Sequence, residues 1–133
     1  MKKEGKSRFI DESNESELGE TNESKHRSIH HIVPTSRGGP KEKWNEYRWS
    51  IKRHRAWHIF THNYLPSEVI ILIRESWTLP NGQLDIEKMG ERFYRAWQKA
   101  FEDWTPQEAI RHIEERFLPV EIQFLNLKKE GTN

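Results

Sequence analysis

The sequence predicts an α+β fold, in which two short strands and a helix are followed by a mainly α-helical C-terminal region. Three observations predict it: β-branched and alternating residues gather before residue 50, helix-start signals recur after it, and the acidic N-terminal segment carries few apolar side chains. The chain has 133 residues, which suits one domain and is too short for two ordinary ones. We therefore expect one active site or one binding surface.

The N-terminal segment, residues 1–24, is rich in Glu, Ser and Asn, and beyond the initiator Met its sizeable apolar side chains are only Phe9, Ile10 and Leu18. So little apolar surface cannot offset the entropy lost on ordering, so we expect a disordered acidic tail. Residues 25–133 are expected to form a single domain.

The first elements are predicted from changes in local pattern. A strand is expected over 28–33, where β-branched residues gather, and a Pro- and Gly-rich loop follows over 34–40. Residues 45–49 alternate polar and aromatic side chains, which is typical of a short strand returning beside the first. Ser50 suits a helix N-cap, so a helix is predicted over 51–62.

The next two helices follow from their start signals. A helix over 66–77 opens with Pro66 in its first turn, and a helix over 86–103 begins after Asp85 as its cap. The second carries an apolar stripe at spacings of three and four, which is predicted to face the core. The stripe consists of Ile86, Met89, Phe93, Trp97 and Ala100.

The last helix is predicted to begin at a capping box over 105–108, with Pro at its first position, and to end before Pro119. Its apolar face consists of Ile110, Ile113 and Phe117. The segment 120–127 alternates like a strand, and packing against the helices is the alternative. We expect residues 63–133 to support the first strands and helix.

Composition excludes several classes of protein. Apolar residues make up 33% of the chain, so the core must be compact and must depend on six Trp and six Phe side chains. The absence of cysteine excludes a disulfide framework, a Cys-based zinc finger, an iron–sulfur site and a thiol nucleophile. The longest apolar run covers 69–73, far below the ~18 residues that span a bilayer, so we expect no membrane partner and a cytoplasmic location.

The net charge of +1 hides a segregation of charge along the chain. Residues 1–24 carry a net charge of −3, residues 25–60 carry +7 and residues 61–133 carry −3. We call residues 25–60 the basic segment. Such a segment indicates an anion-binding surface, most often for nucleic acid, and a solvated basic face is the alternative.

Six of the seven histidines fall between residues 26 and 62. His54 and His58 are four apart on the predicted helix, so both imidazoles can face one ion. A third ligand can come from the His30-His31 pair, but successive strand side chains point to opposite sides, so only one of the two can face the metal. Three neutral nitrogens with a vacant position are typical of a catalytic metal site, and the other imidazole is a natural general base.

Other catalytic signatures are missing. The metalloprotease pattern has Glu after its first His, and this chain has Arg55 there, so peptidase activity is disfavoured. The loop over 37–40 lacks the Gly-Lys-Ser/Thr of a P-loop, and the chain has no Gly-x-Ser-x-Gly nucleophile elbow. The chain therefore lacks the motifs that usually carry out nucleotide hydrolysis and acyl transfer.

These residues together resemble a known motif. The stretch His30-His31-Ile32-Val33-Pro34-Thr35-Ser36-Arg37-Gly38-Gly39, then Asn45, then Lys52-Arg53-His54-Arg55-Ala56-Trp57-His58, is similar to the HNH endonuclease motif in the HH…N…HxxxH form of the colicin DNases. The resemblance covers about residues 27–62. It implies a ββα-metal (His-Me) finger that cuts phosphodiester bonds with one divalent metal ion.

By position, the resemblance implies that His30, His54 and His58 are metal ligands and that His31 is the general base that activates water. It implies that Asn45 braces the loop of the finger and helps to orient the base. Basic side chains around the motif are expected to contact phosphate with little sequence choice. They are Arg27, Arg37, Lys52, Arg53 and Arg55.

The leading hypothesis is therefore a metal-dependent HNH endonuclease that hydrolyses phosphodiester bonds in DNA, with RNA as the alternative substrate. The metal ion would stabilise the leaving group while the histidine base activates water. The alternative is a non-catalytic, metal-stabilised module that binds nucleic acid. Zn, Ni and Mg are all open as the divalent ion, and so are the oligomeric state, the sequence preference and the choice between nicking and double-strand cleavage.

Overall fold

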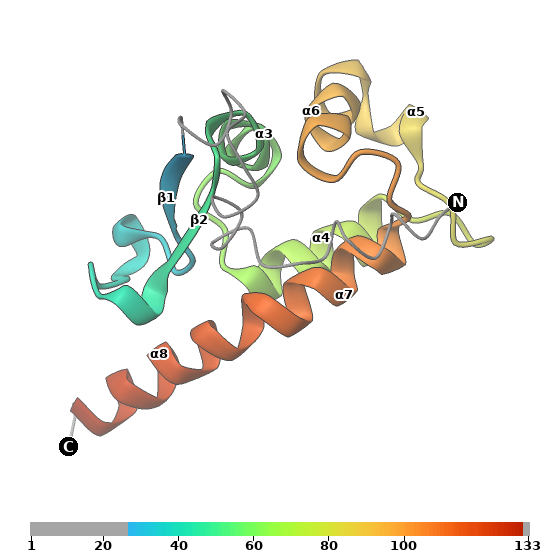
Figure 1. Ribbon diagram of the computed structural model, residues 1–133. Helices are drawn as coiled ribbons and strands as arrows, with labels where there is room; N and C mark the ends of the chain where they lie inside the picture. The colour runs from blue at the N-terminus through green and yellow to red at the C-terminus, as the bar shows by residue number, and fades with distance from the viewer. Residues whose placement is uncertain (1–26, 132–133) are drawn as a thin grey trace.

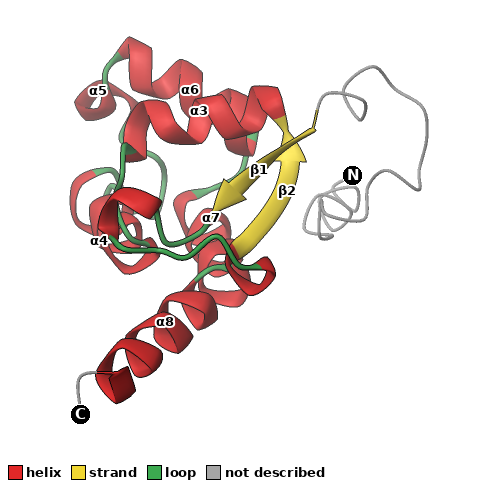
Figure 2. Cartoon of the chain, turned by 90° about the vertical axis from the view of Figure 1, so that its left-hand side faces the viewer, coloured by secondary structure: helices red, strands yellow, loops and turns green. Residues whose placement is uncertain are grey.

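The computed structural model describes residues 27–131, which form a small two-stranded sheet and a set of helices (Figure 1). This mixture agrees with the predicted α+β class. The predicted disordered tail over 1–24 lies outside the described residues. Figures 1 and 2 show the sheet beside α3, with α8 extending away from the other elements.

The sheet pairs β1 (Arg27–His31) with β2 (Glu46–Ser50) in antiparallel register, so that His31 lies opposite Glu46. Two 3-10 turns, η2 (Thr35–Arg37) and η3 (Lys43–Asn45), form the connection between the strands. Both strands were expected, but their bounds differ. β1 ends at His31 and not at 33. Asn45 closes the second turn instead of opening β2, because its buried side-chain amide is hydrogen-bonded to the backbone of Val33.

The double glycine of this connection has a steric cause. A Cβ atom on Gly39 would lie 1.8 Å from the carbonyl oxygen of Val33 and 3.0 Å from Nδ2 of Asn45, so no larger residue fits without a backbone shift. Gly38 has φ of 92°, in the left-handed region that favours glycine. The two glycines thus allow the loop to close against the end of β1.

Three predicted helix starts are confirmed. α3 (Ile51–Thr61) begins at Ser50, whose hydroxyl accepts a hydrogen bond from the Arg53 amide. α4 (Pro66–Ser76) has its proline in the first turn. α7 (Pro106–Arg116) begins at the predicted capping box, in which Thr105 and Glu108 exchange hydrogen bonds.

The prediction of one helix over 86–103 is wrong. The segment forms α5 (Ile86–Met89) and α6 (Glu91–Phe101), which are separated at Gly90 with φ of 87° and ψ of 161°. That conformation is nearly exclusive to glycine and interrupts the helical hydrogen bonding. The predicted core stripe consequently begins at Met89, because Ile86 is 46% exposed, whereas the N-cap role of Asp85 is confirmed.

The strand expected over 120–127 is also wrong, because these residues belong to α8 (Leu118–Gly131). Pro119 stands in the first turn of α8, where a missing backbone N–H breaks no helical hydrogen bond. The proline therefore starts a new helix at the place where α7 ends. Within residues 27–131, no helix has the combination of length and apolar composition needed to cross a bilayer.

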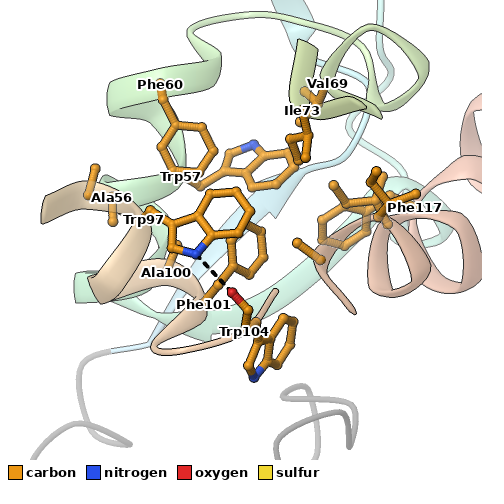
Figure 3. Close-up of a cluster of buried hydrophobic side chains, with 14 of the residues drawn as sticks. Ala56, Trp57, Phe60, Val69, Ile73, Trp97, Ala100, Phe101, Trp104 and Phe117 are labelled. Atoms are coloured by element: carbon orange, nitrogen blue, oxygen red, sulfur yellow. Dashed lines mark hydrogen bonds between the residues drawn. The ribbon is translucent and has the colours of Figure 1, made fainter. Parts of the chain in front are cut away.

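The core is built from aromatic side chains of different helices. α3 lies against α6, and α4 lies against α7 and α8. Figure 3 shows Trp57 and Phe60 of α3 facing Trp97 and Phe101 of α6, with Phe117 beside them. The indole N–H of Trp97 donates to the Trp104 carbonyl over 3.3 Å. Trp57 is buried in this core, on the same helix that carries His54 and His58.

Candidate metal centre

Three histidines converge where β1 faces α3. Each of His30, His54 and His58 offers a ring nitrogen, and the three nitrogens lie within 4.8 Å of one another. The ring centroids of His30 are 5.1 Å from His54 and 5.4 Å from His58. The structure therefore brings together the three side chains expected to be metal ligands.

Strand alternation decides which histidine of the pair joins this cluster. Ser28 and His30 lie on the face of β1 that contacts α3, whereas Ile29 between them is exposed. His54 and His58 lie one helical turn apart on α3, so their rings both face β1. His31 contributes no nitrogen to this cluster, as the alternation predicts.

The two helical histidines turn their Nε2 atoms toward each other, and the remaining ring nitrogens are held by the protein. Nδ1 of His58 lies 3.0 Å from the carbonyl oxygen of His62, which can only accept, so this Nδ1 carries the proton. Nδ1 of His54 lies 2.7 Å from the Ser28 hydroxyl. The two Nε2 atoms are 3.0 Å apart. Two lone pairs at this distance repel each other unless a proton or a cation lies between them.

His30 supplies the strongest structural sign of a missing ligand. Its side chain is 2% exposed, and neither ring nitrogen has a hydrogen-bond partner among the described residues. Its ring lies among Trp49, Trp57 and Phe117. Buried nitrogens without partners are destabilising, and coordination of a metal by one of them would remove part of this cost.

Burial favours the neutral form of His30 and His54, which is the form that binds metal. Burial lowers the pKa of His30 well below its ordinary value of 6.5, with further lowering from His54, His58 and His31. Burial and, to a smaller extent, His58 and His31 together lower the pKa of His54 to about 4. Three nitrogens around a tetrahedral ion are about 3.3 Å apart, which the cluster approaches. The residues present therefore fit a divalent transition ion.

His31 lies beside the cluster but outside it. It is half-buried, and its Nε2 atom is 4.0 Å from Oε2 of Glu46, its partner across the sheet. This distance is too long for a hydrogen bond but allows a charged imidazolium to be stabilised by the carboxylate. His31 is thus a free imidazole one residue away from a candidate ligand.

Asn45 is fully buried and holds the end of β1 to the connection between the strands. Its Oδ1 atom accepts from the Val33 amide over 2.8 Å, and its Nδ2 atom donates over 3.0 Å to the carbonyls of Val33 and Pro40. Its backbone carbonyl accepts from the amide of Ile32, the residue after His31. Asn45 therefore braces the loop, and it touches the predicted base only through the backbone of β1.

Three of the arginines expected to bind phosphate make contacts within the protein. Arg37 donates two hydrogen bonds to Glu68 of α4, at 2.9 and 3.0 Å. Arg53 donates over 2.9 Å to the carbonyl of Ala100, and its guanidinium lies 5.6 Å from the ring of Trp49. Arg27 donates to the Arg48 carbonyl over 3.0 Å. These contacts tie elements together, so Arg37 and Arg53 contribute to the fold whatever else they bind.

The other two predicted basic residues, Lys52 and Arg55, are exposed on α3. Arg55 lines a surface pocket of about 350 Å³ together with His54, His58, Ile59 and His62. Arg92 of α6 lines the same pocket. Two of the candidate metal ligands, His54 and His58, thus open onto a pocket with a basic rim.

Two residues of the site, Ser28 and Arg92, escape the sequence analysis. Ser28 had a usable signal, because it precedes His30 by two positions and therefore shares its strand face. Arg92 had none, since only the packing of α6 on α3 brings it to the site. The helix predicted over 51–62 ends one residue earlier, and His62 is its C-cap with φ of 49°.

The chemistry of the site can be judged from these contacts alone. Three imidazoles face one point, a fourth imidazole lies beside them, and a basic pocket adjoins them. This arrangement is suited to binding a cation and an anionic ligand together. Comparisons of the chain with protein-family models, with curated proteins and with solved structures found no match.

Proposed function

We propose that this protein is a metal-dependent endonuclease of the HNH type that hydrolyses phosphodiester bonds in DNA, and that β1, β2 and α3 form its ββα-metal finger. The observation that carries the proposal is the convergence of His30, His54 and His58 with the free His31 imidazole beside them. The resemblance of the same residues to the HNH motif, together with the net charge of +7 on the basic segment, adds independent support.

In this proposal the ring nitrogens of His30, His54 and His58 hold one divalent ion. When bound, the ion supplies a Lewis acid that stabilises negative charge on the leaving oxygen. Zn²⁺ and Ni²⁺ suit a set of three imidazoles better than Mg²⁺, which prefers oxygen ligands.

The proton transfer belongs to His31. A ring nitrogen of His31 takes a proton from water as the water oxygen attacks phosphorus and the bond from phosphorus to the leaving oxygen breaks. The imidazolium that forms lies near the Glu46 carboxylate, which favours its charge. Asn45 holds the end of β1 and so keeps His31 in place relative to the three ligands.

The test is cleavage of supercoiled plasmid by wild type, His31→Ala and His54→Ala across a panel of divalent ions. His31→Ala should cut about 10²- to 10⁴-fold more slowly and still bind metal with wild-type affinity in calorimetry. His54→Ala should lose both metal binding and cleavage. Ile29→Ala, on the same exposed face of β1 as His31, is the matched control and should cut normally.

Two outcomes would contradict the proposal. One is a His31→Ala protein that cuts as fast as wild type in a preparation free of other nucleases. The other is a wild-type protein that binds metal and DNA but cuts with none of the ions, which would favour the non-catalytic binding module.

A further inference from the structure

A groove leads away from the candidate metal centre between α3 and α6. The pocket beside His54 and His58 adjoins a second pocket on α6, and Ile59 and Arg92 line both. Figures 1 and 2 both show α3 and α6 side by side. We call the two pockets together the α3–α6 groove.

The wall of this groove formed by α6 is basic. Arg92, Arg95 and Lys99 are spaced by three and four residues, so they share one exposed helical face. Glu91 is the carboxylate among the described lining residues, and it forms an exposed ion pair with Arg95 over 2.6 Å between Oε2 and Nη2. Such a pair neutralises charge locally and contributes little to stability.

Three cations of the groove are available to a ligand. Arg92 and Lys99 of α6 and Arg55 of α3 have no ion-pair or hydrogen-bond partner among the described residues. In contrast, Arg37 and Arg53 of the basic segment are bonded to Glu68 and to the Ala100 carbonyl. The free positive charge near the candidate metal centre therefore lies on both helices of the groove.

We infer that the α3–α6 groove binds the phosphate backbone of duplex DNA and that α6 supplies part of the grip through Arg92 and Lys99. This inference rests on the proposed function, because it takes DNA as the ligand. The groove is continuous with the pocket that His54 and His58 line, so a strand with one phosphate at the metal centre has its neighbouring phosphates beside Arg92 and then Lys99. Side chains of this type set affinity with little choice of sequence.

The test measures binding of a fluorescent mixed-sequence DNA duplex in EDTA, so that no cleavage occurs, over a series of salt concentrations. The variant is Arg92→Gln combined with Lys99→Gln. The control is Arg111→Gln combined with Lys128→Gln, which removes the same charge from exposed positions on α7 and α8. All four side chains are exposed, so both double variants should melt near the wild-type temperature.

The expected result is weaker binding by the Arg92/Lys99 variant and a slope of log K against log salt that is smaller by about 1.8, since each lost phosphate contact removes ~0.9. The control should keep the wild-type slope. Wild-type affinity and slope in the Arg92/Lys99 variant would overturn the inference, and so would an equal loss in the control. If the Arg92/Lys99 variant loses more affinity for duplex RNA than for duplex DNA, the choice of DNA as the ligand is overturned.

Cleavage assays with metal on the same proteins separate this inference from the proposed function. Wild type that binds DNA through Arg92 and Lys99 but never cuts supports the groove and contradicts the nuclease. A variant that cuts and binds like wild type contradicts the groove and leaves the nuclease intact. Wild type that does not bind duplex DNA at all overturns the groove.

Discussion

At the scale of single residues, the candidate metal centre depends on groups that do not touch an ion. Ser28 lies 2.7 Å from Nδ1 of His54, and the His62 carbonyl lies 3.0 Å from Nδ1 of His58. Both contacts set the orientation of an imidazole ring, and the His62 carbonyl also favours a lone pair on Nε2 of His58. The preorganisation of the cluster therefore extends beyond its three candidate ligands.

Replacement of Ser28 tests this orientation. Ser28→Ala should lower the affinity for Zn²⁺ or Ni²⁺ by about 10- to 100-fold, because His54 loses the partner that holds its ring and tautomer. Isothermal titration calorimetry of the folded protein measures the change. Ser76→Ala, a half-buried serine at the end of α4, is the control and should bind metal like wild type. Unchanged affinity in Ser28→Ala would show that the hydroxyl does not set the ring.

At the scale of elements, the connection between β1 and β2 is held by one asparagine and one glycine. Asn45 bonds to Val33 and Pro40, and Gly39 lies where any Cβ atom would meet the Val33 carbonyl. Both residues contact the Val33 carbonyl. The short sheet therefore depends on its connection as well as on its ladder of hydrogen bonds.

Gly39→Ala should lower the free energy of unfolding by about 3 kcal/mol or more, because the clash at 1.8 Å is with backbone and cannot be relieved by turning a side chain. Urea denaturation monitored by tryptophan fluorescence measures the change. In Gly131→Ala the added Cβ meets nothing within 4 Å, so this control should lie within about 0.5 kcal/mol of wild type. A Gly39→Ala protein as stable as the control would contradict the packing described here.

At the scale of the whole molecule, the core contains a second buried imidazole far from any role in metal binding. His112 of α7 is 2% exposed, and neither ring nitrogen has a hydrogen-bond partner among the described residues. Its ring lies among Tyr47, Phe101, Trp104 and Phe117. Burial and, to a smaller extent, the charges of Arg53 and Arg116 together lower the pKa of His112 to about 3.

This lowered pKa makes folding stability depend on pH. Between pH 6.5 and about 3, His112 binds a proton in the unfolded chain but not in the folded protein. The contribution of neutral His112 to folding stability is therefore complete above pH 6.5 and is lost as the pH falls toward 3. In His112→Phe this loss is absent. The stability of the variant relative to wild type should therefore rise by about 1.4 kcal/mol for each pH unit below 6.5.

Denaturation of wild type and His112→Phe in EDTA at several pH values measures this difference in stability. The titration of the other histidines cancels in the difference, because both proteins contain them. Ile110→Val, a core change on the same helix without a titratable group, should shift the stability by the same amount at every pH. Parallel stability curves for wild type and His112→Phe would contradict a buried neutral imidazole.

The sequence by itself determined the features that depend on neighbours within a turn or two. Ser50, Pro66 and the Thr105 capping box start helices through their own backbone and side-chain bonds, so their positions were predictable. The candidate ligands were predictable for the same reason: helical spacing pairs His54 with His58, and strand alternation separates His30 from His31. The structure brings together the three predicted ligands.

Only the tertiary structure decided what depends on contacts distant in the chain. Arg37 and Arg53 look like free cations in the sequence, but α4 and α6 supply a carboxylate and a carbonyl that bind them. Arg92 reaches the candidate site because α6 packs on α3, and 120–127 belongs to α8, which packs against α4 and α7. Local propensity carries no information on such pairings, because their energy comes from surfaces that meet only when the chain folds.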